Sequence, residues 1–238
     1  MKVLVVNDDS IHHNNLELLV NELKKYYKDI LVVAPETEQS AVSHKINIRD
    51  EVILKEYPNK FEGVKAYSIN STPADCVKFA ILALKYDFDI CFSGINNGLN
   101  IGEDLKYSGT VSGAVEAYMA NKYGIALSLD RNTQVGFIKG FEMFMKDFNS
   151  KDIYKEHKCF NVNFPNNPKG IYITSQGTND YKYWFEKIGD NLYLPKAEKQ
   201  YKTGINVISD HDAYLNDYIS VTPITFDMTD LNIYNKFK

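Results

Sequence analysis

The chain has 238 residues, of which 44% are hydrophobic and 24% are charged, the ordinary composition of a globular protein. Its 27 basic and 31 acidic side chains give a formal net charge of −4. Proteins that bind extended nucleic acid normally present a basic face, so the composition argues against such a partner, whereas a small anion held through a metal ion is still allowed.

Short apolar runs alternate with helical patterns over the first 150 residues. The predicted strands are short, mostly apolar segments at Val3–Val6, Ile30–Ala34, Phe88–Phe92 and Ile125–Leu129. The first of them is a continuous apolar run, as expected of a strand covered on both faces. Apolar residues at helical spacing predict helices between and after them, at 16–23, 73–84, 111–118 and 137–145. Thr72 is expected to cap the second helix, with Pro73 in its first position and Asp75 completing a capping box. The alternation predicts an α/β fold with a doubly wound, mostly parallel sheet.

The pattern changes after about residue 150. Strands are predicted at Phe160–Phe164, Ile171–Thr174 and Tyr218–Thr222, the last of them ended by Pro223. The segment from Gly177 to Tyr201 is rich in Asn, Asp, Tyr and Lys, which is more typical of hairpins or an arm than of another strand–helix–strand unit. We therefore predict a single domain, residues 1–238, with a core at 1–150 and a β-rich extension at 151–238.

The three cysteines, Cys76, Cys91 and Cys159, do not have the spacing of a zinc site. We expect them to be buried, reduced thiols, which indicates a reducing compartment. The apolar run at the amino terminus is too short for a signal peptide or a membrane span. The expected location is therefore the cytoplasm, with no membrane partner.

Polar residues follow three of the predicted strands, at the edge where an open α/β sheet binds its ligands. The clusters are Asn7-Asp8-Asp9, Glu38-Gln39-Ser40 and Ser93-Gly94-Ile95-Asn96-Asn97-Gly98, the last within a predicted loop over 93–102 that is rich in glycine and asparagine. Adjacent carboxylates raise each other's pKa unless a cation lies between them, and oxygen ligands such as Asp and Asn suit Mg²⁺ or Mn²⁺. Each cluster alone would fit a turn or a helix cap, but their joint position at strand ends favours a metal site.

A phosphate site is predicted at Ser108-Gly109-Thr110, immediately before a helical pattern. Free N–H groups and the positive end of the helix dipole favour an anion there, although Ser108 or Thr110 could equally be an ordinary cap. Neither GxxxxGK followed by Ser or Thr nor GxGxxG occurs, which argues against a P-loop ATPase and a typical dinucleotide-binding fold.

Three histidines and two aromatic residues are further candidates. His12, His13 or His44 could donate a proton to a leaving group near neutral pH, but the spacing does not select one, and surface or structural roles are favoured for each. Tyr183 and Trp184, in the expected arm, could stack on a base or pack between subunits.

Together these segments resemble the SurE family of 5′-nucleotidases, and they occur in the order found in that family. The resemblance rests on Val3–Asp9, Val32–Pro35 with Glu38–Ser40, Thr72–Val77, Ser93–Gly98 with Asn100 and Gly102, Tyr107–Val111, Asn161–Asn163 and Ser220–Pro223. The match covers nearly the whole chain, and the linked set is specific although the single pieces are not.

The resemblance implies a three-layer, Rossmann-like core and a carboxyl-terminal extension that serves as an oligomerisation arm in a homodimer or homotetramer. It also implies one divalent cation per subunit, Mg²⁺ or Mn²⁺, held by Asp8, Asp9, Ser40 and Asn96. Two positions depart from the family pattern, because Ser10 and Ser71 stand where glycine is usual. If position 10 requires a positive φ, a serine there is strained.

The expected activity is hydrolysis of nucleoside 5′-monophosphates, with 3′-monophosphates as a further candidate substrate. Asp8 or Asp9 would orient or deprotonate the attacking water, and the phosphate would be bound by Asn96, Ser108, Gly109 and Thr110. A covalent aspartyl-phosphate is less expected, because a metal-bound carboxylate is a poorer nucleophile. The alternatives are a receiver-like signalling module, although the acceptor Asp after its third strand is missing here, and a non-catalytic nucleotide-binding protein.

Overall fold

The computed structural model describes residues 1–131, 133–201 and 209–238, and its centre is a nine-stranded sheet with the order β3-β4-β2-β1-β5-β6-β7-β11-β8. These strands are β1 (Lys2–Val6), β2 (Asp29–Pro35), β3 (Leu54–Glu56), β4 (Lys65–Ile69), β5 (Ile90–Asn97), β6 (Tyr123–Leu129), β7 (Cys159–Phe164), β8 (Gly170–Ile173) and β11 (Tyr218–Pro223). Neighbouring strands from β4 to β7 all run parallel. Those six strands follow the order of a Rossmann-like, doubly wound sheet.

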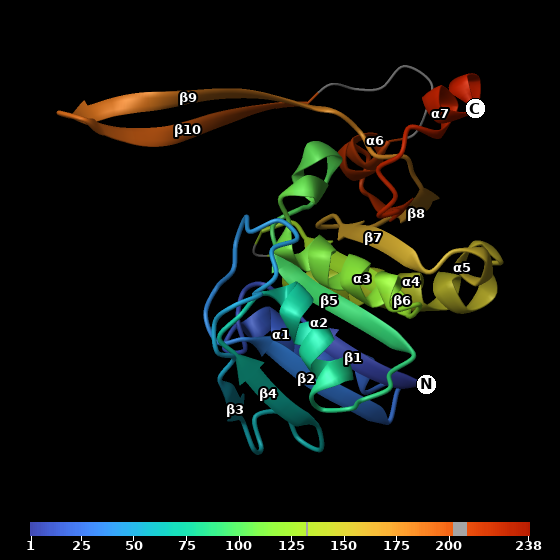
Figure 1. The fold of residues 1–238 in the computed structure, drawn as a ribbon. Helices are drawn as coiled ribbons and strands as arrows, with labels where there is room; N and C mark the ends of the chain where they lie inside the picture. The colour runs from blue at the N-terminus through green and yellow to red at the C-terminus, as the bar shows by residue number, and fades with distance from the viewer. Residues whose placement is uncertain (132, 202–208) are drawn as a thin grey trace.

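Helices cover both faces of the sheet, so the core has three layers (Figure 1). The helices are α1 (Asn14–Leu23), α2 (Pro73–Leu82), α3 (Gly109–Met119), α4 (Gln134–Ser150), α5 (Ile153–Glu156), α6 (Asp210–Leu215) and α7 (Leu231–Phe237), with a 3₁₀ helix η1 (Gly102–Lys106). Val3 and Val5 of β1 pack with α1 and α4, whereas Leu4 and Val6 pack with α2 and α3. This period-two division is what a strand buried on both faces requires, and the predicted fold is confirmed.

The segment after Phe92 differs from the prediction of a loop over 93–102. β5 continues to Asn97, and after a register shift it pairs again with β6 at Asn96 and Asn97. Gly94 permits the irregularity, because its φ is +140° and a Cβ there would lie 2.4 Å from the Leu127 carbonyl oxygen. The loop prediction is therefore wrong for residues 93–97, where turn-forming residues belong to a strand.

The segments after residue 150 continue the central sheet. β7 pairs with β6, and β11 lies between β7 and β8, antiparallel to the first and parallel to the second. Pro223 belongs to β11 instead of following it. The predicted division at about residue 150 stays a prediction, and residues 202–208 of the extension lie outside the described residues.

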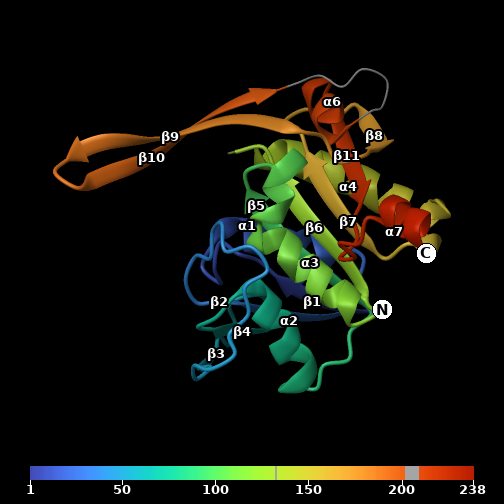
Figure 2. The same ribbon diagram turned by 45° about the horizontal axis from the view of Figure 1, so that its top comes forward.

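A long hairpin lies within the segment predicted to contain hairpins or an arm. β9 (Asn179–Gly189) and β10 (Leu192–Tyr201) pair antiparallel and project away from the sheet (Figures 1 and 2). The three cysteines are buried and free, as expected. In the described part of the chain, no helix combines the length and apolar character that a membrane crossing requires.

Candidate active site

The strand order reverses between β1 and β5, and this creates a crevice beyond the carboxyl ends of two neighbouring strands. Asp8 and Asp9 follow directly after the end of β1, and Asn96 and Asn97 are the last residues of β5. Side chains that are almost 90 residues apart in the sequence therefore lie at the same edge of the sheet.

A cavity of about 580 Å³ opens at this crevice, a size that suits a small ligand. All four residues expected to hold a cation line it, namely Asp8, Asp9, Ser40 and Asn96. Ser108 from the predicted phosphate segment lines it as well. The structure thus brings together at least one residue from each predicted polar segment.

Asp8 is almost fully buried, and Thr110 holds its carboxylate in place. The Thr110 N–H donates to Asp8 Oδ2 at 3.1 Å, and the Thr110 hydroxyl donates to Asp8 Oδ1. Burial raises the pKa of Asp8 to about 6; the Thr110 hydroxyl opposes this shift, and the charge of Asp9 adds to it. A cation beside Asp8 would favour the ionised form and offset the cost of burying it.

Asp9 is less buried and is held from the side of β5. Its Oδ2 accepts a hydrogen bond from the Asn97 N–H at 3.3 Å and lies 3.9 Å from His13 Nδ1. Burial raises the pKa of Asp9, while His13 and the Asn97 N–H oppose the shift and Glu38 adds to it. Asp9 is therefore a carboxylate with a raised pKa at the wall of a cavity, as expected of a functional group.

The other two oxygen donors are placed by main-chain contacts. The Gln39 N–H donates to the Asp8 carbonyl oxygen at 2.7 Å, which fixes the turn carrying Ser40 beside the end of β1. The Asn96 Nδ2 donates to the Gly98 carbonyl oxygen at 2.7 Å, so the amide oxygen is the atom of Asn96 left to face a cation. Two carboxylates, an amide and a hydroxyl form a donor set that fits Mg²⁺ or Mn²⁺.

Acidic side chains dominate the cavity. Glu38 and Asp104 line it in addition to Asp8 and Asp9. Among the described lining residues, Arg131 is the single arginine or lysine that opposes these four carboxylates. No group of three or more His, Cys, Asp and Glu side chains in the described chain is placed to hold a metal, so a site here depends on the Ser and Asn oxygens. A phosphate group would be repelled by this excess of carboxylates unless a cation were bound.

The predicted phosphate segment lies at the start of α3, but its members differ in position. Ser108 lines the cavity and also caps the helix, since its Oγ accepts from the Val111 N–H at 3.1 Å. Thr110 is buried behind Asp8 with both its N–H and its hydroxyl donating to that carboxylate. Gly109 packs there as well, and a Cβ on it would lie 3.0 Å from the Asp8 Cβ.

The family model described as Survival protein SurE matches residues 3–183 of the chain. The chain belongs to the SurE family. It is 36% identical to the 5′-nucleotidase SurE of Natranaerobius thermophilus, over 99% of this chain and 96% of the relative. It is 33% identical to the 5′-nucleotidase SurE of Clostridium botulinum, over 98% and 96%. The crystal structure of the SurE protein from Aquifex aeolicus is similar over 100% of this chain and 98% of that one, with a TM-score of 0.82 and 31% identity. The expected family is confirmed, and membership in it excludes the alternative of a receiver-like signalling module.

One departure of this SurE chain from the family pattern lies beside the acidic pair. Ser10 has a φ of +93°, a region that favours glycine, and this strain is on the order of 1–3 kcal/mol. The Asn7 Nδ2 donates to the Ser10 carbonyl oxygen at 2.8 Å and helps hold the turn. Ser71, the second departure, does not have a positive φ, and its hydroxyl donates to Asp75.

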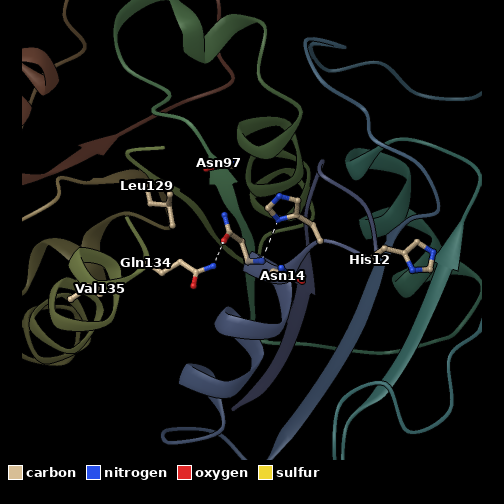
Figure 3. A pocket seen from close by; sticks show the side chains of 8 residues that line it. His12, Asn14, Asn97, Leu129, Gln134 and Val135 are labelled. Carbon is tan, nitrogen blue, oxygen red and sulfur yellow. Dashed lines mark hydrogen bonds between the residues drawn. The ribbon is translucent and has the colours of Figure 1, made fainter. Parts of the chain in front are cut away.

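A second cavity, of about 550 Å³, adjoins the first at His13 and Asn97, which line both. Figure 3 shows it between the starts of α1 and α4, where the Gln134 Nε2 donates to Asn15 Oδ1 at 3.1 Å. His13 caps α1, and its Nδ1 accepts from the Asn15 N–H at 3.2 Å.

The other two candidate histidines do not line the cavity that holds the acidic pair. His12 lies toward β3 and β4, with its Nε2 3.3 Å from the Tyr57 hydroxyl (Figure 3). The His44 Nε2 lies 2.9 Å from Glu116 Oε2 on α3. Of the three, the structure therefore places only His13 beside Asp9.

Arg131 is one of the lining residues, with Asp104, that were not predicted from the sequence. It follows the end of β6 by two residues and so occupies the same edge of the sheet as Asp8 and Asn96. The signal was available, because a buried apolar strand ends directly before Asp130-Arg131. Applying the strand-end rule to this strand as well would have found it.

Proposed function

We propose that this chain is a metal-dependent phosphatase that hydrolyses nucleoside 5′-monophosphates to nucleoside and phosphate, with 3′-monophosphates as a second substrate class. The observation that carries the proposal is the cavity between the ends of β1 and β5, which is lined by Asp8, Asp9, Ser40, Asn96 and Ser108. The relatives named 5′-nucleotidase SurE, similar along almost the entire chain, support the class of reaction and substrate.

The proposed cofactor is one divalent cation per subunit, Mg²⁺ or Mn²⁺, held by Asp8, Asp9, Ser40 and Asn96. Such an ion would supply positive charge to the phosphoryl group and activate water as a nucleophile. The need for it follows from the four carboxylates that line the cavity, because Arg131 alone leaves the wall negative. Thr110 keeps Asp8 in one orientation, which preorganises the site.

Asp9 is the residue that we assign to the attacking water. Its carboxylate lies at the wall of the cavity, where it can accept a proton from water, and the Asn97 N–H fixes its orientation. Asn96 and Ser108 would bind the phosphoryl oxygens, together with Arg131 on the same cavity wall, whereas Thr110 keeps both of its donors on Asp8. Positioned donors of this kind stabilise the charge that develops during phosphoryl transfer.

We further propose a cytoplasmic homodimer or homotetramer in which the β9–β10 hairpin is the oligomerisation arm. Tyr183 and Phe185 lie on one face of this hairpin and are exposed, and Trp184 between them is exposed on the opposite face. An apolar strand face on a projecting hairpin gains stability when a second copy covers it. The buried free thiols support a reducing compartment.

A nucleotide panel tests the function. The protein is treated with EDTA, reconstituted with Mg²⁺ or Mn²⁺, and assayed for phosphate release from 5′- and 3′-nucleoside monophosphates. We expect release from 5′-monophosphates only after a cation is added. If tight nucleotide binding were found without phosphate release, the non-catalytic alternative would be correct instead.

Without a cation, the fold is expected to lose stability as the pH rises from about 4 to about 6. The reason is the pKa of Asp8, which burial raises from its ordinary value of 3.8 to about 6. In this window the carboxyl group is ionised in the unfolded chain but still protonated in the fold, so rising pH favours unfolding. Above about pH 6 the loss is complete and is on the order of 3 kcal/mol.

A cation that binds the ionised carboxylates should restore this stability. We expect Mn²⁺ to raise the Tm at pH 7.5, and about tenfold more Mn²⁺ to be needed at pH 5, where about a tenth of Asp8 is ionised. Thermal unfolding of EDTA-treated protein at both pH values measures this. Asp8→Asn should remove most of the difference in Mn²⁺ requirement between the two pH values. Equal Mn²⁺ requirements at pH 5 and pH 7.5 in the unsubstituted protein would contradict the prediction.

A further inference from the structure

The chain between β5 and α3 forms one wall of the catalytic cavity. Residues from Asn96 to Asn100 line it, and Asp104, Tyr107 and Ser108 continue the same wall through η1. We call residues 98–108 the cavity loop. The conformation of this loop determines the position of Ser108 and of the end of β5 relative to Asp8. Contacts that fix the loop therefore also fix the proposed phosphate site.

The first fixed point of the cavity loop is Asn100, which is held by side chains of β7. Asn163 Oδ1 accepts from the Asn100 N–H at 2.9 Å, and Asn163 Nδ2 donates to the Asn100 carbonyl oxygen at 3.0 Å. Asn161 Nδ2 donates to the same carbonyl at 2.8 Å. Both β7 side chains are fully buried, so each bond replaces a contact with water that is no longer accessible.

The second fixed point is Gly102, whose two main-chain groups are both held by residues at the base of the arm. The Gly102 N–H donates to Asp210 Oδ2 at 2.9 Å, and the Gly102 carbonyl oxygen accepts from Gln176 Nε2 at 2.9 Å. Asp210 Oδ1 in turn accepts from the Gly177 N–H at 2.8 Å, just before β9 begins. One buried carboxylate therefore joins the cavity loop to the root of the hairpin.

Asp210 is itself rigidly placed. It is fully buried at the start of α6, and its own N–H donates to the Ser175 carbonyl oxygen at 2.9 Å. Ser209 and Asp212 form a capping box that fixes the first turn of α6. A buried carboxylate bonded by main-chain N–H groups is held strongly, because losing one of these bonds leaves a charge or an N–H without a partner.

We propose that Asn163 and Asp210 are positioning residues for catalysis, through which the carboxyl-terminal extension holds the cavity loop in its active geometry. The proposal rests on the proposed phosphatase function. It gives the extension a role in the active site of its own chain, in addition to assembly. Neither residue lines the cavity, so each acts through the loop and not on the substrate.

The experiment compares Asp210→Asn, Asn163→Ala and Gln176→Ala with Thr222→Val as the control. Thr222 is equally buried on β11, and its hydroxyl bonds to Thr174 at 2.8 Å instead of to the main chain of the cavity loop. The readouts are kcat/KM for the best nucleotide, the inhibition constant of inorganic phosphate, and the Tm. Asp210→Asn and Asn163→Ala should lower kcat/KM about tenfold and weaken phosphate inhibition to a similar extent. The reason is that a displaced cavity loop would bind both the transition state and inorganic phosphate less well.

Gln176→Ala should give a smaller change in the same direction, and Thr222→Val should lower only the Tm. Should Asp210→Asn fail to fold, Gly177→Ala serves in its place, because the new Cβ would lie 2.7 Å from Asp210 Oδ1 and displace the carboxylate without removing it. Folded variants with unchanged phosphate inhibition would overturn the proposal, even if kcat fell along with the Tm. An inactive unsubstituted protein would instead refute the phosphatase function itself.

Discussion

Asp9→Asn is expected to lower the turnover number for nucleotide hydrolysis by at least about a hundredfold, the range lost when a general base is removed. The amide keeps the shape of the side chain and can still accept the hydrogen bond from the Asn97 N–H. It cannot accept a proton, and it removes one of the negative charges that hold the cation. The loss should therefore appear mainly in kcat, measured with saturating nucleotide and Mn²⁺.

The fold should tolerate this substitution, because burial already favours the uncharged form of Asp9 and raises its pKa. Asp152→Asn, at an exposed side chain just before α5, is the matched control and should leave kcat unchanged. Metal content measured after dialysis separates a lost cation from a lost base. Normal turnover in a metal-loaded Asp9→Asn protein would remove Asp9 from the mechanism.

Strands buried on both faces could be predicted from the sequence because their apolar runs are continuous. Val3–Val6 and Ile30–Ala34 are such runs, and both lie inside the sheet, in β1 and β2. β4 was not predicted, because Lys65–Ile69 lies toward the outer side of the sheet and mixes polar with apolar residues instead of forming an apolar run. The extension of β5 was missed because Ser, Gly and Asn resemble a turn unless a neighbouring strand, here β6, supplies the pairing.

The candidate site was predictable where it depends on strand ends and not where it depends on tertiary contacts. The rule that ligands bind beyond the carboxyl ends of parallel strands selected Asp8, Asp9 and Asn96, which line one cavity. The hydrogen bonds from Thr110 to Asp8 join residues 102 positions apart, and no local sequence pattern predicts them. The same holds for Asp210, which lies 108 residues from Gly102 and meets it only in the folded chain.

Gly124→Ala is expected to lower the free energy of unfolding by about 3 kcal/mol, the upper part of the range for overpacking a core. Gly124 lies on β6 beneath α3, and a Cβ there would stand 1.9 Å from the carbonyl oxygen of Ala114. Ordinary contact begins at 3.4 Å, so α3 would have to move away from the sheet by about 1.5 Å. The obstacle is helix backbone, which cannot relieve the clash by changing a rotamer.

The same displacement should reach the active site, because α3 begins at Gly109 and its second residue, Thr110, holds Asp8. A shift of about 1 Å in a positioning element costs roughly a hundredfold in rate, so the folded fraction of Gly124→Ala should be nearly inactive. Urea unfolding and kcat, both measured below the new Tm, test the two effects separately. Gly189→Ala is the control, since its Cβ would meet nothing closer than Leu192 Cβ at 3.6 Å and should leave both quantities unchanged. If Gly124→Ala kept full activity with reduced stability, α3 would not be the element that positions Asp8.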